Sequence, residues 1–387
     1  MRSLSRKTVA WATGAVVALG GGTAGIVIAA QSGGQAPRAS AAAGKAHPVV
    51  VQPLRLVSVT PAAGGKGVNG ATDITVTYNK PLPATAPLPA LSPAIAGTWQ
   101  RTGDSVTFTP QAGFPASTRV TVMVKGTTES SGRSGSSSFT TGKYSTLRLQ
   151  EVLAQLGYLP LTWTPTAAPV VRGYQGTSAA AATAAPVRSA ATQLSAAYAP
   201  PAGTFRWETG YPARLRSFWA QGQPNTLDRG AVTGFEADHG LPTDGVAGPK
   251  VWSVLLAAAA KKQQNTHGYS YAIVSKGSPE TLTIWHDGGK VFSSLANTGI
   301  GVAPTVDGTF PVYERLTFQI MQGTNPDGSH YADPVSWVSY FNGGDAVHYF
   351  PRGSFGYPQS LGCVELPYSA AKQAYPYLPY GTLVTVE

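Results

Sequence analysis

Apolar and polar residues alternate along most of the chain between residues 50 and 142. Apolar side chains occupy every second position in Ile74–Tyr78, in Val106–Phe108 and in Val120–Val124. Side chains of a β-strand point alternately to its two faces, so this period predicts short strands that bury one face. Gly and Pro residues separate the runs, as the turns of a β-sandwich require. We therefore predict a β-sandwich over residues 50–142.

The apolar period becomes helical in residues 143–262. Apolar residues between Leu149 and Leu156 fall on one helical face, and those between Val232 and Leu256 repeat the pattern. Residues from about 160 to 202 are rich in Ala, Thr and Pro and have no clear period, which predicts a partly flexible insertion. We expect a small three-helix domain with this insertion between its helices.

Strand periodicity returns in residues 268–387. Short alternating runs occupy Tyr271–Val274, Leu282–Trp285 and Val291–Leu295, and the last two flank an Asp287-Gly288-Gly289 sequence typical of a hairpin turn. The pattern predicts an all-β domain with few short helices. The whole chain is thus expected to be mainly β and multidomain.

Residues 1–49 have the features of an export segment. Basic Arg2, Arg6 and Lys7 precede an uncharged run from Thr8 to Ala30, long enough to span a bilayer as a helix. Small residues around Ser40 would also suit signal-peptide cleavage. A retained anchor and a cleaved signal remain open, and either one predicts an extracytoplasmic location at the cell wall or the outer face of the membrane.

Charge and cysteine content narrow the range of partners. The 387 residues contain 28 Lys and Arg against 18 Asp and Glu, giving a net charge of +10 that favours anionic partners. Basic residues are not dense outside the extreme N-terminus, so we do not expect nucleic-acid binding. Anionic wall polymers or a lipid surface suit such diffuse charge better. One cysteine excludes an intrachain disulfide.

That cysteine, Cys363, lies in the stretch with the clearest candidate chemistry. Gly362 precedes it, and His348 lies fifteen positions earlier, beyond a loop rich in Gly and Pro. A thiol on a glycine turn, facing a histidine from a strand end, is the arrangement of a Cys–His nucleophile pair. A lone cysteine is more often a small buried apolar residue. The hypothesis of a nucleophile pair therefore depends on Cys363 and His348 occurring together around one loop.

The same stretch resembles a known family. His348 followed by Ser360-Leu361-Gly362-Cys363-Val364 resembles the signature of the L,D-transpeptidase catalytic domain of the YkuD type, in which a His and a loop precede Ser-His-Gly-Cys-Ile/Val. The resemblance covers about the last 120 residues. Leu361 stands where the family usually has a second His, Glu365 where Arg or Asn is common, and Tyr349 where a small residue is usual.

The resemblance implies acyl transfer between peptidoglycan stem peptides, without a metal or a cofactor. Cys363 would attack a tetrapeptide donor, release its terminal D-Ala and form a thioester. The side-chain amine of a diamino-acid acceptor would then complete a 3→3 cross-link, while His348 takes and returns protons. Carbapenem-type inhibitors are expected to acylate the same thiol.

Supporting roles follow for several residues. An imidazole near Cys363 can stabilise a thiolate as an ion pair. With Leu361 apolar, we expect a backbone carbonyl, that of Tyr349, to orient His348. Ser360 would hydrogen-bond within the loop, and Gly362 would turn the backbone so that N–H groups near Cys363 face an oxyanion.

Three further residues are candidates for substrate binding. Tyr331 follows a Pro-Asp-Gly turn, as a flap tyrosine does in the family, and could donate its phenol. Arg352 could hold a substrate carboxylate, although a solvated loop arginine is an equal alternative. Trp337 could line a groove beside the strand that carries His348.

The two other domains also resemble known modules. Residues 50–142 resemble bacterial Ig-like domains, which implies a spacer or interaction role. Residues 143–262 resemble a small peptidoglycan-binding domain, best between Phe235 and Trp252. Glycan strands would then be a further partner, or the helices only brace the catalytic domain.

Two alternatives to the transpeptidase remain open. An L,D-carboxypeptidase would use water in place of the acceptor amine. A non-catalytic wall-binding scaffold is suggested by the departures at Leu361 and Glu365.

Overall fold

A computed structural model describes residues 54–111, 113–128, 134–166, 190 and 192–387. The expected export segment at residues 1–49 lies outside them. None of the helices in the described ranges has the length and apolar character needed to cross a membrane.

The first folded segment is a β-sandwich, as predicted. One sheet has the order β1-β2-β5-β4 and the other β3-β6-β7. The alternating residues Ile74, Val76 and Tyr78 of β2 are buried in the core between them. The strand bounds are β1 (Leu56–Thr60), β2 (Ile74–Tyr78), β3 (Ala90–Ser92), β4 (Gly97–Thr102), β5 (Ser105–Pro110), β6 (Arg119–Thr128) and β7 (Ser134–Thr140).

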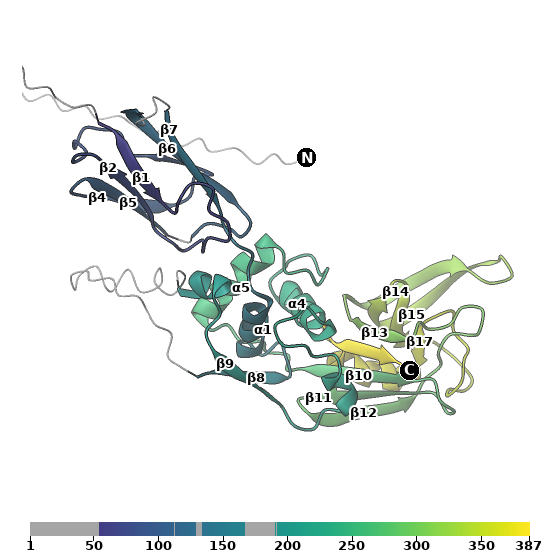
Figure 1. Cartoon of the computed structure of the whole chain (residues 1–387). Coiled ribbons are helices and arrows are strands. Elements are labelled where there is room, and N and C mark those ends of the chain that lie inside the picture. The colour runs from purple at the N-terminus through teal and green to yellow at the C-terminus, as the bar shows by residue number, and fades with distance from the viewer. Residues whose placement is uncertain (1–53, 112, 129–133, 167–189, 191) are drawn as a thin grey trace, which may run out of the picture. The chain divides into compact units, whose positions relative to one another are not determined.

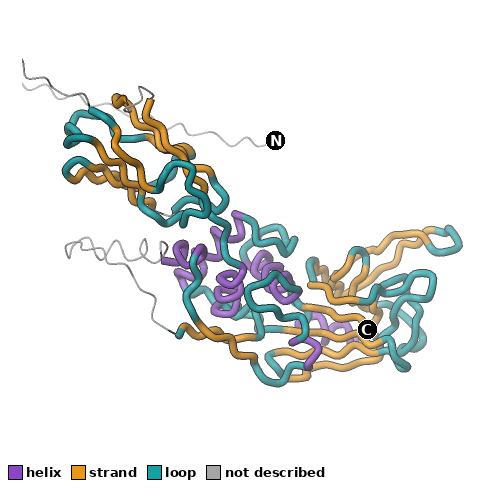
Figure 2. Tube along the Cα trace, viewed as in Figure 1, coloured by secondary structure: helices purple, strands orange, loops and turns teal. Residues whose placement is uncertain are grey.

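The middle segment contains the predicted helices, which Figure 2 shows in purple. They are α1 (Thr146–Gln155), the short α3 (Ala213–Arg216), α4 (Thr226–Asp238) and α5 (Pro249–Lys261). Asn225 and Asp228 form a capping box at the start of α4, which satisfies two backbone donors at that helix end. Gln150 of α1 donates to the buried Asp228 carboxylate at 2.9 Å and so joins the two helices.

The described ends of the expected insertion are folded. β8 (Leu161–Pro165) pairs antiparallel with β9 (Gly203–Trp207), and residues 192–198 are helical. Leu194 and Ala197 are buried in the same core as α1. A two-stranded ribbon and a helix of about two turns are too short to give a readable period, which is why the sequence indicated less order here.

The C-terminal segment consists of two sheets and few helical turns, as predicted. One sheet has the order β12-β11-β10-β18-β13, and the other β14-β15-β16-β17. The bounds are β10 (Ser270–Ser275), β11 (Thr281–His286), β12 (Gly289–Leu295), β13 (Gly308–Pro311), β14 (Glu314–Thr324), β15 (His330–Asn342), β16 (Asp345–Tyr349), β17 (Val364–Leu366), β18 (Leu383–Val386), α6 (Tyr368–Ala374) and the 3₁₀ turn η1 (Tyr375–Tyr377).

The predicted hairpin between β11 and β12 is confirmed. The two strands pair antiparallel. Asp287 and Gly288 at the turn have φ values of 45° and 77°. Positive φ at two successive turn residues is the requirement of a type I′ turn, which explains why Asp-Gly occurs here.

The helical and C-terminal segments share one hydrophobic core. Tyr271 of β10 and Leu383 of β18 are fully buried in the cluster that contains Leu227 and Phe235 of α4. A Cβ on Gly230 of α4 would lie 2.7 Å from the Gly381 carbonyl oxygen, so the backbones approach closely. This packing supports the alternative in which the helices brace the catalytic domain.

Candidate active site

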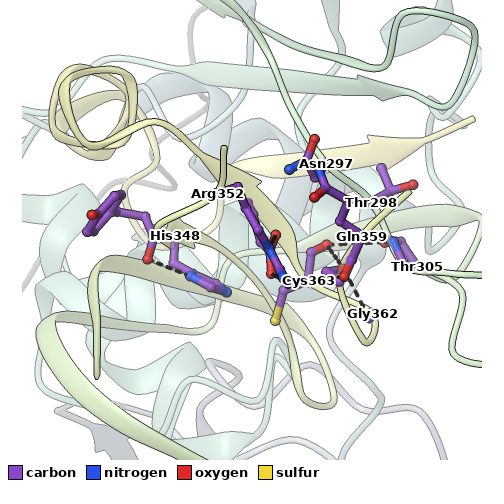
Figure 3. Close-up of polar contacts among 12 residues, drawn as sticks. Asn297, Thr298, Thr305, His348, Arg352, Gln359, Gly362 and Cys363 are labelled. Carbon is purple, nitrogen blue, oxygen red and sulfur yellow. Dashed lines mark hydrogen bonds and ion pairs between the residues drawn. The ribbon is translucent and has the colours of Figure 1, made fainter. Parts of the chain in front are cut away.

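Two parallel strands bring the candidate nucleophile and base to one face of a sheet. β16 pairs with β17 so that His348 lies opposite Glu365. Cys363 precedes Glu365 by two residues, and alternate residues of a strand share a face. Diagonal neighbours on one face of a sheet lie about 7–8 Å apart, within the reach of longer side chains. In Figure 3, the imidazole of His348 and the sulfur of Cys363 project to the same side of these strands.

Both residues line one pocket of about 430 Å³. Its far wall comes from the long β14–β15 hairpin, visible in Figure 1, which contributes Gln319, Met321 and Tyr331. The volume falls in the usual range for sites that bind a small molecule or a peptide segment. A thiol and an imidazole therefore face a space large enough for a substrate.

The surroundings of the Cys363 thiol favour its protonated form. Its Sγ donates to the Gly344 carbonyl oxygen at 3.7 Å. Burial raises the pKa of this thiol to about 12, and the Asp345 and Glu365 carboxylates act in the same direction. A hydrogen bond from Ser360 Oγ to the Cys363 carbonyl oxygen, at 2.6 Å, fixes the backbone of the cysteine.

His348 is set up as a neutral base. It is 3% exposed, and its Nδ1 is 2.9 Å from the Tyr349 carbonyl oxygen, the contact expected from the sequence. A carbonyl only accepts, so Nδ1 carries the proton and Nε2 keeps a free lone pair. Burial lowers the pKa of the imidazole, and this opposes its protonation.

These shifts do not favour the thiolate–imidazolium ion pair expected from the sequence. The thiol pKa rises and the imidazole pKa falls, and both shifts favour the neutral forms of the two groups. The loop composition did not reveal that His348 would be buried and Cys363 partly buried, nor that two carboxylates would lie close to the sulfur. A neutral thiol would have to pass its proton to a base as it attacks.

Gly362 holds the turn before the nucleophile. Its φ is 118°, a region that side-chain-bearing residues rarely adopt, and a Cβ there would lie 2.5 Å from Asp345 Oδ1. Its N–H donates to Ser360 Oγ at 3.2 Å. The Gly362 N–H is thus occupied within the loop, and the oxyanion role expected for N–H groups near Cys363 stays a prediction.

A Gly362→Ala variant should lose stability because of this backbone conformation. We expect a loss of roughly 1–3 kcal/mol, the usual cost of forcing a residue into a sparsely populated φ/ψ region. Thermal or urea unfolding measures it. Gly353→Ala in the same loop is the matched control, because nothing lies within 4 Å of its added Cβ. Equal stability of the two variants would contradict this account of the turn.

Arg352 is engaged inside the protein. Its Nε and Nη2 donate to the two carboxylate oxygens of Glu365, each at 2.7 Å, and Nη2 also donates to the Gln359 carbonyl oxygen at 3.0 Å. The guanidinium also lines the pocket, so the substrate-carboxylate role expected from the sequence stays a prediction. The sequence analysis treated Arg352 and Glu365 as unrelated residues, whereas in the structure they form an ion pair.

Tyr331 lies where a phenol donor was expected. It lines the pocket from β15 and lies opposite Gly323 of β14. A Cβ on Gly323 would collide with the Tyr331 ring, so this glycine makes room for it. Burial raises the phenol pKa, and a negative charge on Cys363 would raise it further, so the phenol stays a donor.

Trp337 does not line the pocket, which corrects the sequence expectation. The β15–β16 register shifts between Ser336 and Ser339, and Trp337 has a φ of 61° within this bulge. An extra residue reverses the alternation of side chains, so Val335 and Tyr340 line the pocket while Trp337 packs on Tyr368 and Tyr375. The sequence prediction for Trp337 assumed that side chains alternate without interruption along this strand.

Sequence reasoning missed the residues that hold the loop between His348 and Cys363. Gln359 N–H and Ser360 N–H both donate to the Thr298 carbonyl oxygen at 2.9 Å. Asn297 Oδ1 accepts from the Gly356 N–H at 2.9 Å. Figure 3 shows both residues beside the loop. They come from a distant part of the chain, so no local pattern could have assigned them.

Across the described residues, no group of three or more His, Cys, Asp or Glu side chains is placed to hold a metal ion.

Comparison with protein families identifies two of the segments. Residues 269–386 match the L,D-transpeptidase catalytic domain and residues 50–141 match a bacterial Ig-like domain. The C-terminal segment is thus an L,D-transpeptidase catalytic domain and the sandwich is Ig-like. Neither match covers the helical segment, so its resemblance to a peptidoglycan-binding domain stays a prediction. No curated protein matches the chain.

Several solved structures are similar over parts of the chain. An L,D-transpeptidase from Mycobacterium smegmatis is 15% identical, with 87% of this chain and 100% of that chain covered and a TM-score of 0.29. L,D-transpeptidase 3 from Mycobacterium tuberculosis, in complex with a faropenem-derived adduct, is 15% identical over 86% and 98%, with a TM-score of 0.29. The catalytic domain of the E. faecium L,D-transpeptidase is 24% identical over 32% and 100%, with a TM-score of 0.29. TM-scores this low do not place individual residues.

Proposed function

We propose that this chain is an exported peptidoglycan L,D-transpeptidase that forms 3→3 cross-links through a thioester on Cys363. One observation carries the proposal: the only cysteine of the chain shares a pocket with a buried histidine whose Nε2 is free to take a proton. The family of residues 269–386 supports transpeptidation of peptidoglycan as the reaction class.

The first step would acylate the enzyme. Cys363 Sγ attacks the amide carbonyl on the L-centre of the third residue of a donor tetrapeptide, and its proton passes to His348 Nε2. The carbon–nitrogen bond to the terminal D-Ala then breaks. Nε2 returns the proton to the leaving amine, and a thioester remains on Cys363.

The second step would transfer the acyl group. The side-chain amine of an acceptor diamino acid attacks the thioester carbonyl and gives a proton to His348 Nε2. The carbon–sulfur bond breaks, the thiol is reprotonated, and a new amide joins the two stems. In both steps a carbonyl oxygen gains negative charge, and the protonated Tyr331 phenol is suited to donate to it.

The departures from the family signature do not remove this chemistry. Glu365 is neutralised by Arg352, and Leu361 is an apolar part of the pocket wall. The orienting bond to His348 comes from a backbone carbonyl and needs no second histidine. The scaffold alternative therefore loses the two observations that suggested it. The basic N-terminal residues and the uncharged run that follows them support export, which would bring the pocket to its polymer.

Product analysis with purified disaccharide-tetrapeptides separates the candidates. We expect mass spectrometry to find cross-linked dimers that have lost one D-Ala. Tripeptide monomers without dimers would indicate an L,D-carboxypeptidase. Unchanged substrate with a folded protein would contradict both enzymes and favour the scaffold. Cys363→Ser is the matched blank for background hydrolysis.

A further inference from the structure

The ion pair between Arg352 and Glu365 lies directly beside the reacting thiol. Glu365 is 4% exposed, lines the same pocket as Cys363 and follows it by two residues. Two residues of extended chain span about 7 Å. An unpaired carboxylate at that distance, shielded from water, would oppose any negative charge that develops on Sγ.

Arg352 is held in place to pair with this carboxylate. Both carboxylate oxygens accept from it at 2.7 Å, the bidentate geometry that Arg alone among side chains supplies. The guanidinium also lies over the Phe350 ring, 4.6 Å from its centroid, and binds the Gln359 carbonyl oxygen. Among the described residues that line the pocket, it is the only Lys or Arg.

We propose that Arg352 acts on the reaction through Glu365: it neutralises this carboxylate and so permits negative charge to form on Cys363 and on the substrate carbonyl oxygen. Arg352 is then a positioning residue that need not touch the substrate. The inference rests on the proposed function, in which Cys363 is the nucleophile.

The negative charge on Glu365 is expected to raise the pKa of the Cys363 thiol. Glu365 is among the groups that raise the pKa of Cys363, after burial and Asp345. The other ionisable groups that line the pocket are Tyr331, Asp333, Tyr340, Asp345 and His348. All of them stay unchanged in the variants below, so a difference in thiol reactivity reports on the Arg352–Glu365 pair.

Alkylation of the thiol tests this directly, because the chain has one cysteine. The rate with iodoacetamide at a fixed pH below the thiol pKa is proportional to the thiolate fraction. Arg352→Met keeps an apolar stem over Phe350 but leaves Glu365 unpaired. We expect its rate to fall roughly 50-fold, the effect of one unit charge at about 7 Å in a medium of effective dielectric constant about 20.

Two further variants separate charge from loop structure. Arg352→Met combined with Glu365→Gln removes the unpaired carboxylate without restoring the bond to Gln359, and should recover most of the lost rate. Glu365→Gln alone leaves the Arg352 cation near the sulfur and should react faster than the wild type. A purely structural pair predicts that both variants are as slow as, or slower than, Arg352→Met.

Controls and contrary outcomes complete the test. Arg214→Met removes one partner of the exposed Arg214–Glu387 pair, outside the pocket, and should leave the rate unchanged. Thermal unfolding checks that each variant is folded. A double variant as slow as Arg352→Met, or a Glu365→Gln variant slower than the wild type, would overturn the inference. Failure of the proposed function would instead leave alkylation intact while stem peptides form no adduct.

Discussion

A Cys363→Ser variant should lose turnover of stem peptides by on the order of 10⁴-fold or more, as removal of a catalytic nucleophile does in other acyl-transfer enzymes. The hydroxyl is similar in size but is a weaker acid and a poorer nucleophile than the thiol. The assay is the initial rate of D-Ala release from a purified tetrapeptide.

The same variant should fold normally. Cys363 is only partly buried at the pocket wall, and its backbone is held by Ser360 rather than by the sulfur. Thermal unfolding close to that of the wild type would show that the loss of turnover is chemical. Retention of more than a few per cent of the rate by folded Cys363→Ser would contradict its role as nucleophile.

A His348→Gln variant should acylate at least about 10²-fold more slowly, within the usual range for loss of a general base. Gln approximates the imidazole in size but cannot take a proton at neutral pH. The rate of carbapenem adduct formation, followed by intact mass, measures acylation without a second substrate. His286→Gln is the matched control, since His286 lies outside the pocket.

The pH dependence of acylation tests whether His348 is the general base. A general base must be neutral, and burial lowers the pKa of His348 below its ordinary value near 6.5. Wild-type acylation should therefore persist as the pH falls through 6.5 and decline only at lower pH. The His348→Gln variant should lack this decline. A wild-type midpoint at or above 6.5 would contradict this account of the base.

The sequence predicted the fold class and indicated a candidate nucleophile, because both have local patterns. Alternating residues such as Ile74 and Val76 predicted the sandwich, and Asp287-Gly288 predicted a hairpin turn. The bond from His348 to the Tyr349 carbonyl could be anticipated once Leu361 was seen to be apolar. Each of these inferences depends on neighbours in sequence.

The remainder of the site depends on long-range contacts that no local pattern contains. The bulge at Trp337 reversed the side chains of β15, and its position could not be read from the local sequence. The pairing of Arg352 with Glu365 required the parallel register of β16 and β17. The pKa shifts that favour neutral Cys363 and His348 follow from loss of contact with water, which the loop sequence between them did not reveal.

The most direct test of the central claim is to trap the acyl-enzyme with a tetrapeptide donor. Acid quenching followed by peptide mass mapping should find the tripeptide acyl group on the fragment that contains Cys363. The adduct should be absent from Cys363→Ser and should form more slowly in His348→Gln. Formation of cross-linked dimers without any adduct on Cys363, or with an adduct on another residue, would contradict the account.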